Sequence, residues 1–260
     1  MRADVYLCER GYVSSRRRAR ELIESGCVTV DGKPITKPAA PLSEEGSYEI
    51  VVTETLPYVG RGGLKLEAAL DAFSLDVKGL TTLDIGASTG GFTDCLLLRG
   101  AERVYAVDAG VGQLAQKLRE DPRVVVRERL NARSLVPEQI EGARVDLIVM
   151  DVSFISATYI LPRFPILLKE EGYAVCLIKP QFEVGKSMLG KGGIVKDPAA
   201  HRFAVERVME GGRSVGLAPI GLIPSPVTGG DGNREFLICF AKGKSDRPIL
   251  QKQDVPNLMK

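Results

Sequence analysis

Residues 81–94, TTLDIGASTGGFTD, decide the fold, because a short apolar run passes directly into a glycine-rich turn that carries an early aspartate. Gly86, Gly90 and Gly91 can adopt backbone angles that are closed to other residues, and they let a ligand approach the main chain closely. A bulky side chain would fill that space. The stretch therefore predicts a strand followed by a turn that holds a nucleoside cofactor.

An acidic residue ends the next predicted strand. The run RVYAVD over residues 103–108 ends in Asp108, which follows Asp84 at close to the offset of roughly 20 residues at which a carboxylate binds ribose hydroxyls. The turn lacks both the G-x-G-x-x-G order and a Walker lysine, which disfavours dinucleotides and triphosphates. Asp84 would repel a phosphate but could receive a cationic amine. S-adenosylmethionine, with its amino-acid end and sulfonium, fits these features.

Composition indicates a globular protein with a large domain and a small one, since 260 residues with 44% hydrophobic content can bury a full core. The longest apolar runs, such as 145–150 and 173–178, are far shorter than the roughly 20 residues that cross a bilayer. No apolar signal segment begins the sequence. We expect a cytoplasmic protein with no membrane partner.

The number and spacing of the cysteines and histidines disfavour several kinds of catalytic and metal site. The five cysteines are scattered and never in C-x-x-C spacing, so we expect buried thiols and predict neither disulfides nor a metal site. His201 is the only histidine, and its polar surroundings predict a surface helix side chain. Ser-His-Asp hydrolysis and multi-histidine metal catalysis are therefore disfavoured. Proton chemistry must use lysine, carboxylate or tyrosine.

Residues 1–56 predict a small first domain of two helices and short strands. Its expected elements are a helix from Asp4, a helix over 16–24 capped by Ser14 or Ser15 and ended by Gly26, a strand over 28–30, the hairpin turn Asp31-Gly32, a proline-rich loop over 33–41 and a strand near 48–52. The net charge of +2 does not indicate a nucleic-acid partner by itself. The basic side chains crowded at the start of the second helix do favour phosphate binding: Arg16, Arg17, Arg18 and Arg20.

Residues 57–63 predict a linker, and the larger domain is expected over 64–242, opening with a helix over 64–73. Strands and helices then alternate, and the expected strands cover 81–85, 104–108, 124–126, 146–150, 174–178, 221–223 and 236–241. This spacing predicts an α/β fold with a doubly wound sheet of seven strands, the last two forming an antiparallel pair at one edge. Residues 243–260 predict a loosely held tail.

Charged residues gather where the predicted strands end. Asp151 follows one buried strand, and Lys179 follows the next. Lys65 lies in the first turn of the helix before the glycine turn, and Glu235 opens the last strand. A structural ion pair at two strand ends is the alternative reading of Asp151 and Lys179.

These motifs carry a family resemblance. The order lysine, aspartate, lysine, glutamate around a cofactor turn resembles the tetrad of FtsJ-type ribose 2′-O-methyltransferases, and SRRRARELIESGCVTVDGK over 15–33 resembles the alpha-L RNA-binding domain. Joined by RGGLK over 61–65, both resemble the TlyA (hemolysin A-like) family of ribosomal RNA methyltransferases over nearly the whole chain. The resemblance implies a cofactor, S-adenosylmethionine, and a partner, ribosomal RNA or a ribosomal subunit. It assigns the catalytic places to Lys65, Asp151, Lys179 and Glu235, and the cofactor places to Asp84, Gly86, Ser88, Gly90, Gly91, Phe92, Asp108 and Asp151.

Ribose methylation reduces to deprotonation and alignment, because the sulfonium methyl is already activated while a 2′-hydroxyl is a poor nucleophile. A lysine acts as a base only when burial or a neighbouring like charge lowers its pKa. Our hypothesis is that Lys179 takes or steers the hydroxyl proton and Lys65 positions the ribose. Arg61, together with Lys186 and Lys191 in the glycine-rich loop over 182–193, is a further candidate RNA contact.

Competing readings have specific weaknesses. Base-amine methylation normally uses an Asn/Asp-Pro-Pro-aromatic element where this chain has DVSF over 151–154, and pyrimidine-carbon methylation needs a nucleophilic cysteine where Cys176 lies inside a strand. A pseudouridine synthase would need an Arg-Leu-Asp element and would leave the cofactor turn unexplained. A non-catalytic ribosome assembly factor stays open, as does a membrane-lysing protein, although no segment is long or amphipathic enough to insert.

Overall fold

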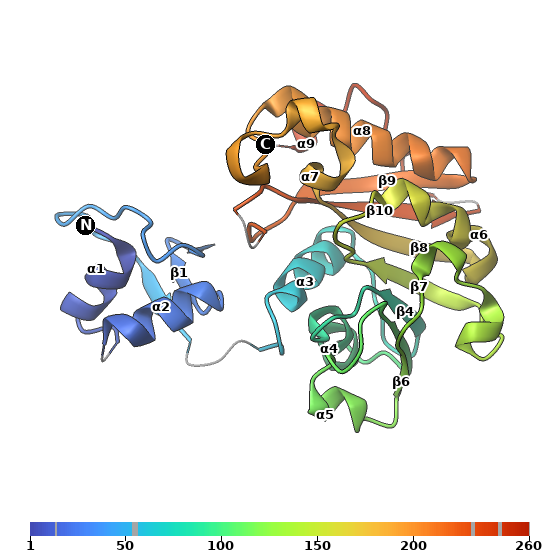
Figure 1. The fold of residues 1–260 in the computed structure, drawn as a ribbon, viewed down its shortest axis with the longest axis horizontal. Coiled ribbons are helices and arrows are strands. Elements are labelled where there is room, and N and C mark those ends of the chain that lie inside the picture. Colours follow the sequence, from blue (N-terminus) through green and yellow to red (C-terminus); the bar gives the residue numbers. More distant parts are fainter. Residues whose placement is uncertain (14, 54–56, 230–231, 244–245, 260) are drawn as a thin grey trace. The chain divides into compact units, whose positions relative to one another are not determined.

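The computed structural model describes residues 1–13, 15–53, 57–229, 232–243 and 246–259. The chain forms two compact units, Met1–Arg61 and Gly62–Lys260 (Figure 1). The division falls inside the segment 57–63 that the sequence predicts as a linker, and the first helix of the second unit begins within that segment, at Gly62.

The first unit is a small α+β domain, as predicted. Its elements are α1 (Ala3–Glu9), α2 (Arg16–Glu24), β1 (Val28–Val30), β2 (Lys33–Pro34) and β3 (Ile50–Val52). The three strands form an antiparallel sheet in the order β2-β1-β3. Asp31 and Gly32 make the tight turn between β1 and β2, both with positive φ (51° and 72°), which is the backbone that an Asp-Gly hairpin favours.

Helix α2 begins where the sequence predicts. The Ser15 hydroxyl accepts a hydrogen bond from the backbone amide of Arg18 at 3.2 Å, so Ser15 is the N-cap; Ser14 lies outside the described residues. Ala19, Leu22 and Ile23 on the opposite face are buried, which turns the arginines of this helix outward.

The second unit is a seven-stranded α/β domain. Its strands are β4 (Thr81–Ile85), β5 (Arg103–Val107), β6 (Val124–Arg127), β7 (Val145–Met150), β8 (Leu168–Ile178), β9 (Leu217–Pro224) and β10 (Phe236–Lys242). Its α-helices are α3 (Gly62–Ala72), α4 (Gly91–Leu98), α5 (Gln116–Arg119), α6 (Phe164–Leu167), α7 (Pro180–Glu183), α8 (Pro198–Ser214) and α9 (Val255–Leu258). Its short 3-10 turns are η1 (Ala132–Ser134), η2 (Pro137–Ile140), η3 (Ala157–Tyr159), η4 (Leu161–Arg163), η5 (Lys186–Met188) and η6 (Lys191–Gly193).

The strand order is β6-β5-β4-β7-β8-β10-β9. Strands β6, β5, β4, β7 and β8 are parallel, whereas β10 inserts antiparallel between β8 and β9. The predicted doubly wound sheet and its antiparallel edge pair are confirmed. Because β10 runs against its neighbours, its first residue lies at the same edge of the sheet as the last residues of β4, β5, β7 and β8.

Helices cover both faces of this sheet, with α8 on one side and α3 and α4 on the other (Figure 1). Alternate residues of each strand therefore enter different cores: Leu83 and Ile85 of β4 join the cluster that contains α8. Between them, Asp84 points to the other face and meets Thr93 of α4. Burial on both faces accounts for the continuous apolar runs that mark the strands in the sequence.

His201 corrects the expectation of a surface side chain. It is buried in α8, its ring contacts that of Phe236 at 5.7 Å, and its Nε2 lies 3.0 Å from the Val195 carbonyl oxygen. Burial lowers the pKa of its imidazole. It sits one helical turn before the buried Val205, so it belongs to the apolar stripe of the helix despite its polar neighbours.

The expectation of a loosely held tail is also wrong for residues 246–259. Val255 is fully buried and Met259 nearly so, both within the main core of the second unit. The Leu250 amide donates to the Pro219 carbonyl at 2.8 Å, which covers part of the outer edge of β9. In the part of the chain that the structure describes, no helix is long and apolar enough to cross a membrane.

Candidate active site

The glycine turn after β4 has the backbone that the sequence predicts. Gly86 (φ +84°) and Gly90 (φ +99°) both lie in the left-handed region. A Cβ on Gly86 would lie 2.3 Å from the Asp151 carbonyl oxygen, and one on Gly90 would lie 2.2 Å from the Leu118 Cδ1 atom. Glycine is therefore required at both positions by conformation and by space.

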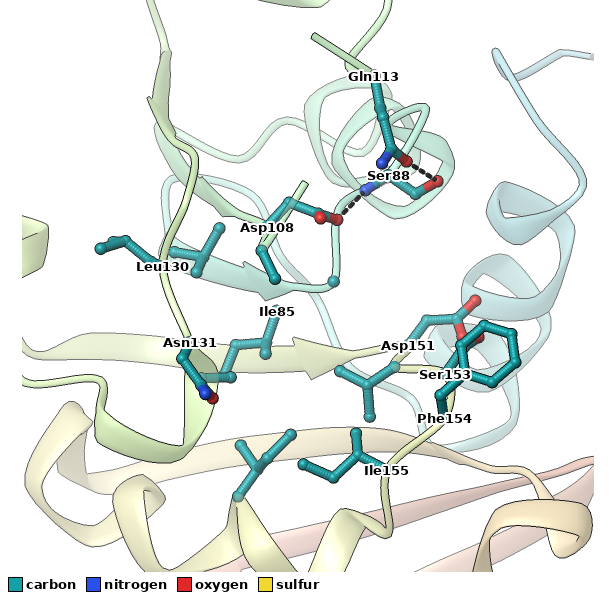
Figure 2. Close-up of a pocket in the computed structure, with 16 residues that line it drawn as sticks. Ile85, Ser88, Asp108, Gln113, Leu130, Asn131, Asp151, Ser153, Phe154 and Ile155 are labelled. Atoms are coloured by element: carbon teal, nitrogen blue, oxygen red, sulfur yellow. Dashed lines mark hydrogen bonds between the residues drawn. The ribbon is translucent and has the colours of Figure 1, made fainter. Parts of the chain in front are cut away.

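A cavity of about 500 Å³ opens beside this turn, at the ends of β4, β5 and β7 (Figure 2). Such a volume is typical of small-ligand sites. Its walls combine apolar and polar side chains: Ile85, Gly86, Ser88, Val107, Asp108, Ala109, Gln113, Leu130, Asn131, Ala132, Asp151, Val152, Ser153, Phe154, Ile155 and Ile160. Four of the predicted cofactor residues line it, namely Gly86, Ser88, Asp108 and Asp151.

Asp108 is fixed in place at the cavity wall by backbone amides. One oxygen accepts from the Ser88 amide at 2.8 Å (Figure 2). The other oxygen accepts from the Gly110 amide at 2.6 Å. The Ser88 hydroxyl donates to the Gln113 side-chain oxygen at 3.2 Å. A carboxylate oxygen can accept more than one hydrogen bond, so Asp108 retains acceptor capacity for ribose hydroxyls.

Asp84 lies under the turn instead of in the cavity wall. It is fully buried, its Oδ2 accepts from the Thr93 hydroxyl at 2.7 Å, and its Oδ1 has no hydrogen-bond partner among the described residues. Burial raises the pKa of this carboxyl to about 7; the Thr93 hydrogen bond opposes the rise, and the charges of Asp151 and Asp108 add to it. A buried acceptor without a partner is consistent with a site for a cationic group beside the turn.

The raised pKa of Asp84 makes the stability of the ligand-free protein depend on pH. An acid whose pKa is higher in the folded state than in the unfolded state stabilises the fold while it is protonated. For Asp84 this contribution is complete below pH 3.8, the pKa in the unfolded state, and is lost as the pH rises through about 7. Relative to Asp84→Asn, whose amide oxygen can still accept from Thr93, the wild type should lose on the order of a few kcal/mol of unfolding free energy across this range. Denaturant titrations of both proteins at several pH values check this, and parallel pH curves would contradict it.

Substitution of Gly86 by alanine should disable the site. The clash with the Asp151 carbonyl adds to the strain of a positive φ, a local cost of about 1–3 kcal/mol, so we expect cofactor affinity to fall roughly tenfold or more. Gly79→Ala is the matched control, because Gly79 has φ +73° and nothing within 4 Å of its Cβ position. Calorimetric titration with S-adenosylhomocysteine measures both, and equal affinities would refute the steric argument.

The four predicted catalytic residues form two ion pairs. The Lys179 ammonium lies 2.5 Å from the Asp151 carboxylate, and the Lys65 ammonium lies 2.5 Å from the Glu235 carboxylate. Lys179 also donates to the Ser153 hydroxyl at 2.8 Å. Asp151 and Ser153 both line the cavity, which brings the first pair to its edge.

The sheet brings the two pairs together. Phe236 pairs with Ile178 on the neighbouring antiparallel strand, so Glu235, directly before Phe236, and Lys179, directly after Ile178, lie next to the same paired position. Burial raises the pKa of the Glu235 carboxyl, and the ammonium of Lys65 opposes the rise most strongly. The charge of Lys179 lowers the same pKa and that of Asp151 raises it, so all four groups share one electrostatic site.

Other predicted site residues lie elsewhere. Gly90 is the N-cap of α4, and Gly91 and Phe92 are its first residues; like Asp84, they do not line the cavity. The candidate RNA contacts Lys186 and Lys191 are exposed on the loop after α7.

The arginines of α2 are exposed, and Arg16, Arg17 and Arg20 line a shallow hollow of the first unit together with two glutamates. Glu21 lies within ion-pair distance of Arg17 (3.6 Å) and Arg18 (3.5 Å), so the basic cluster is partly neutralised. Arg61 ends the first unit.

Several lining residues were not predicted. Asn131 lies in the loop after β6, four residues past the end of the strand, so the strand-end rule that identified Asp108 points to this loop but not to this residue. Gln113 and Phe154 carry no sequence signal, because loop geometry alone brings them to the cavity. Cys176 is fully buried in β8 and burial raises the pKa of its thiol well above the usual value, which argues against a nucleophilic role. Among the described residues, no group of three or more His, Cys, Asp or Glu side chains could hold a metal ion.

Comparison with known proteins places the chain in a family. Residues 58–242 match the FtsJ-like methyltransferase model, and residues 1–46 match the S4 domain. Over 96% of this chain and 93% of the relative, the sequence is 45% identical to a Mycobacterium tuberculosis protein named 16S/23S rRNA (cytidine-2′-O)-methyltransferase TlyA. The chain belongs to the TlyA family of ribosomal RNA methyltransferases. The expected family and the expected pair of domain types are thereby confirmed.

Other members of this family carry a different label. A Brachyspira hyodysenteriae protein named Hemolysin A is 41% identical over 92% of this chain and 99% of its own length. A solved Streptococcus thermophilus structure, also described as a hemolysin, covers 99% of this chain and 94% of its own with a TM-score of 0.76 and 39% identity. A methyltransferase structure from Mesorhizobium loti that depends on S-adenosylmethionine shares the fold at 14% identity, with a TM-score of 0.52 over 67% of this chain and 96% of its own.

Proposed function

We propose that this protein transfers a methyl group from S-adenosylmethionine to a ribose 2′-hydroxyl of ribosomal RNA, with Lys65, Asp151, Lys179 and Glu235 as the catalytic residues. The observation that carries this proposal is the meeting of two lysine–carboxylate pairs at one edge of the sheet, beside the cavity after the glycine turn. The Mycobacterium tuberculosis relative is named for methylation of this kind of hydroxyl.

The cavity suits the proposed cofactor. Asp108 would bind its ribose hydroxyls, while Ile85, Leu130 and Ile155 offer apolar surface for the adenine ring. The turn at Gly86 and the buried carboxyl of Asp84 would receive the amino-acid end. When bound, S-adenosylmethionine supplies an activated methyl group on a sulfonium.

The protein then has to align the hydroxyl and manage its proton. Lys179 reaches the cavity edge, and its two contacts, Asp151 and Ser153, hold its ammonium in one orientation. In this position Lys179 takes or steers the proton of the 2′-hydroxyl. Lys65, held by the buried Glu235, positions the ribose.

The S4 domain supports an RNA substrate, since its exposed arginines offer phosphate contacts. Incubation of the protein with methyl-labelled S-adenosylmethionine and ribosomal RNA or isolated subunits tests the function. We expect label in the RNA; binding to the RNA without label transfer would instead support a non-catalytic assembly factor.

A further inference from the structure

A second cavity of about 530 Å³ lies beside the first. Phe154 and Ile155 contribute to both cavities, so a single turn of chain after Asp151 separates them. The far wall of the second cavity is formed by Tyr159 and Phe182, together with two arginines, Arg133 and Arg207. None of these four residues lines the cavity proposed for the cofactor.

The shared wall holds an aromatic ring at the surface. Phe154 is 91% exposed and has a positive φ of 65°, a conformation that is costly for a bulky residue. Its ring lies 5.2 Å from that of Phe182, tilted by 48°. An exposed aromatic ring in strained backbone, packed beside the half-buried ring of Phe182, indicates a surface that a ligand covers.

A buried carboxylate fixes this turn. Glu183 is 2% exposed, and its carboxylate accepts from the Ser156 hydroxyl at 2.5 Å and from the Ala157 amide at 2.7 Å. These contacts tie the chain after Phe154 to α7, which carries Phe182. The aromatic surface is therefore preorganised, so a ligand would not have to order it.

The second cavity is also basic. The Arg133 guanidinium lies over the Tyr159 ring, 5.2 Å from its centroid, and Arg207 donates to the Glu183 backbone carbonyl at 2.6 Å. Among the described residues, none that lines this cavity carries a carboxylate. The Glu183 carboxylate is buried and does not line the cavity. Aromatic rings beside arginines, without acids, are typical of surfaces that stack the bases of single-stranded RNA.

We propose that the second cavity binds the unpaired base of the nucleotide next to the one that is methylated, with Tyr159 and Arg133 as its main contacts. This inference rests on the proposed function. The methylated ribose must lie at Lys179 and face the first cavity, and only the turn at Phe154 separates that cavity from the second. An RNA strand whose methylated ribose lies at Lys179, and which continues over Phe154, would place its next base between Tyr159 and Phe182.

Photo-crosslinking tests the placement of that base. The photoreactive residue p-benzoylphenylalanine replaces Tyr159, the protein is irradiated with ribosomal RNA or subunits, and reverse-transcription stops are compared with the methylated position made by the wild type. We expect the crosslink at the nucleotide directly flanking the methylated one. A crosslink at the methylated nucleotide itself, at a distant nucleotide or nowhere would overturn the inference. An absence of methylation by the wild type would instead refute the proposed function.

Steady-state kinetics supply a second, independent measurement. Stacking of one base is worth about 1–3 kcal/mol, so Tyr159→Ala should raise KM for the RNA roughly fivefold to a hundredfold and leave kcat nearly unchanged. Tyr159→Phe keeps the ring and should behave as the wild type. Phe203→Ala is the control, because Phe203 is another exposed aromatic residue of this unit, outside both cavities. An unchanged KM for Tyr159→Ala, or a loss confined to kcat, would contradict the proposal.

Discussion

Replacement of Lys179 by alanine is expected to remove methyl transfer while leaving cofactor affinity nearly intact. Lys179 contacts Asp151 and Ser153 at the cavity edge, whereas the proposed cofactor contacts are made by other residues. Loss of a general base costs about 10²–10⁴-fold in kcat. Label transfer from S-adenosylmethionine to RNA, paired with calorimetric binding of S-adenosylhomocysteine, separates the two quantities.

Two further variants sharpen this test. Lys179→Arg keeps the positive charge but cannot release a proton near neutral pH, so it should also be inactive if Lys179 takes the proton. Lys169→Ala removes a lysine of β8 that pairs with a carboxylate, Asp146, at 2.8 Å on the surface, and it should leave turnover unchanged. Normal turnover by Lys179→Ala would reject the catalytic assignment, and normal turnover by Lys179→Arg alone would reduce Lys179 to a positioning role.

Replacement of Glu235 by alanine is expected to cost both stability and turnover. Glu235 and Lys65 are paired at 2.5 Å with side chains 2% and 9% exposed, so the variant leaves a lysine charge buried without its partner. Breaking a buried ion pair from one side destabilises a protein by about 3–5 kcal/mol. The free Lys65 ammonium would also lose the orientation proposed for holding the ribose.

Glu67→Gln is the matched control for Glu235→Ala, because Glu67 belongs to the same helix as Lys65 and lies 3.5 Å from Arg99 at the surface. A surface pair contributes about 0–1 kcal/mol, so its denaturation midpoint should barely move. Equal midpoints and equal turnover for the two variants would show that the Lys65–Glu235 pair is neither structural nor catalytic.

Much of the fold follows from local patterns in the sequence. The apolar runs that predict the strands reflect burial on both faces of the sheet, and the Asp31-Gly32 turn and the Ser15 cap are local effects of backbone and side-chain chemistry. The position of β10 between β8 and β9 has no such local cause. Sequence spacing predicts an antiparallel pair at one edge but not which member is outermost.

Two expectations failed because tertiary contacts outweighed local polarity. His201 stands among polar residues, yet helical spacing places it on the buried stripe with Val205 and Met209. The chain after residue 246 reads as a polar tail, but its few apolar residues, Val255 and Met259 among them, enter the core of the second unit. In both segments the spacing of the apolar residues predicts burial better than the overall polarity of the segment does.

The candidate site was predictable where strand ends determine it. Asp108, Asp151 and Lys179 each directly follow a parallel strand, so the rule that ligands bind at the carboxyl ends of such strands identifies them. Phe154 and Tyr159 escaped prediction, because a turn held by the buried Glu183 brings them to the surface, and that tertiary contact leaves no periodic signal.

The most direct test of the central claim is the chemical identity of the methylated nucleoside. Ribosomal RNA treated with the wild type or with Lys179→Ala is digested to nucleosides and analysed by mass spectrometry, and the position is mapped by resistance to alkaline cleavage. The proposed site predicts a 2′-O-methylated nucleoside at a defined position with the wild type only. A methyl group on a base, or the same ribose methylation by Lys179→Ala, would contradict it.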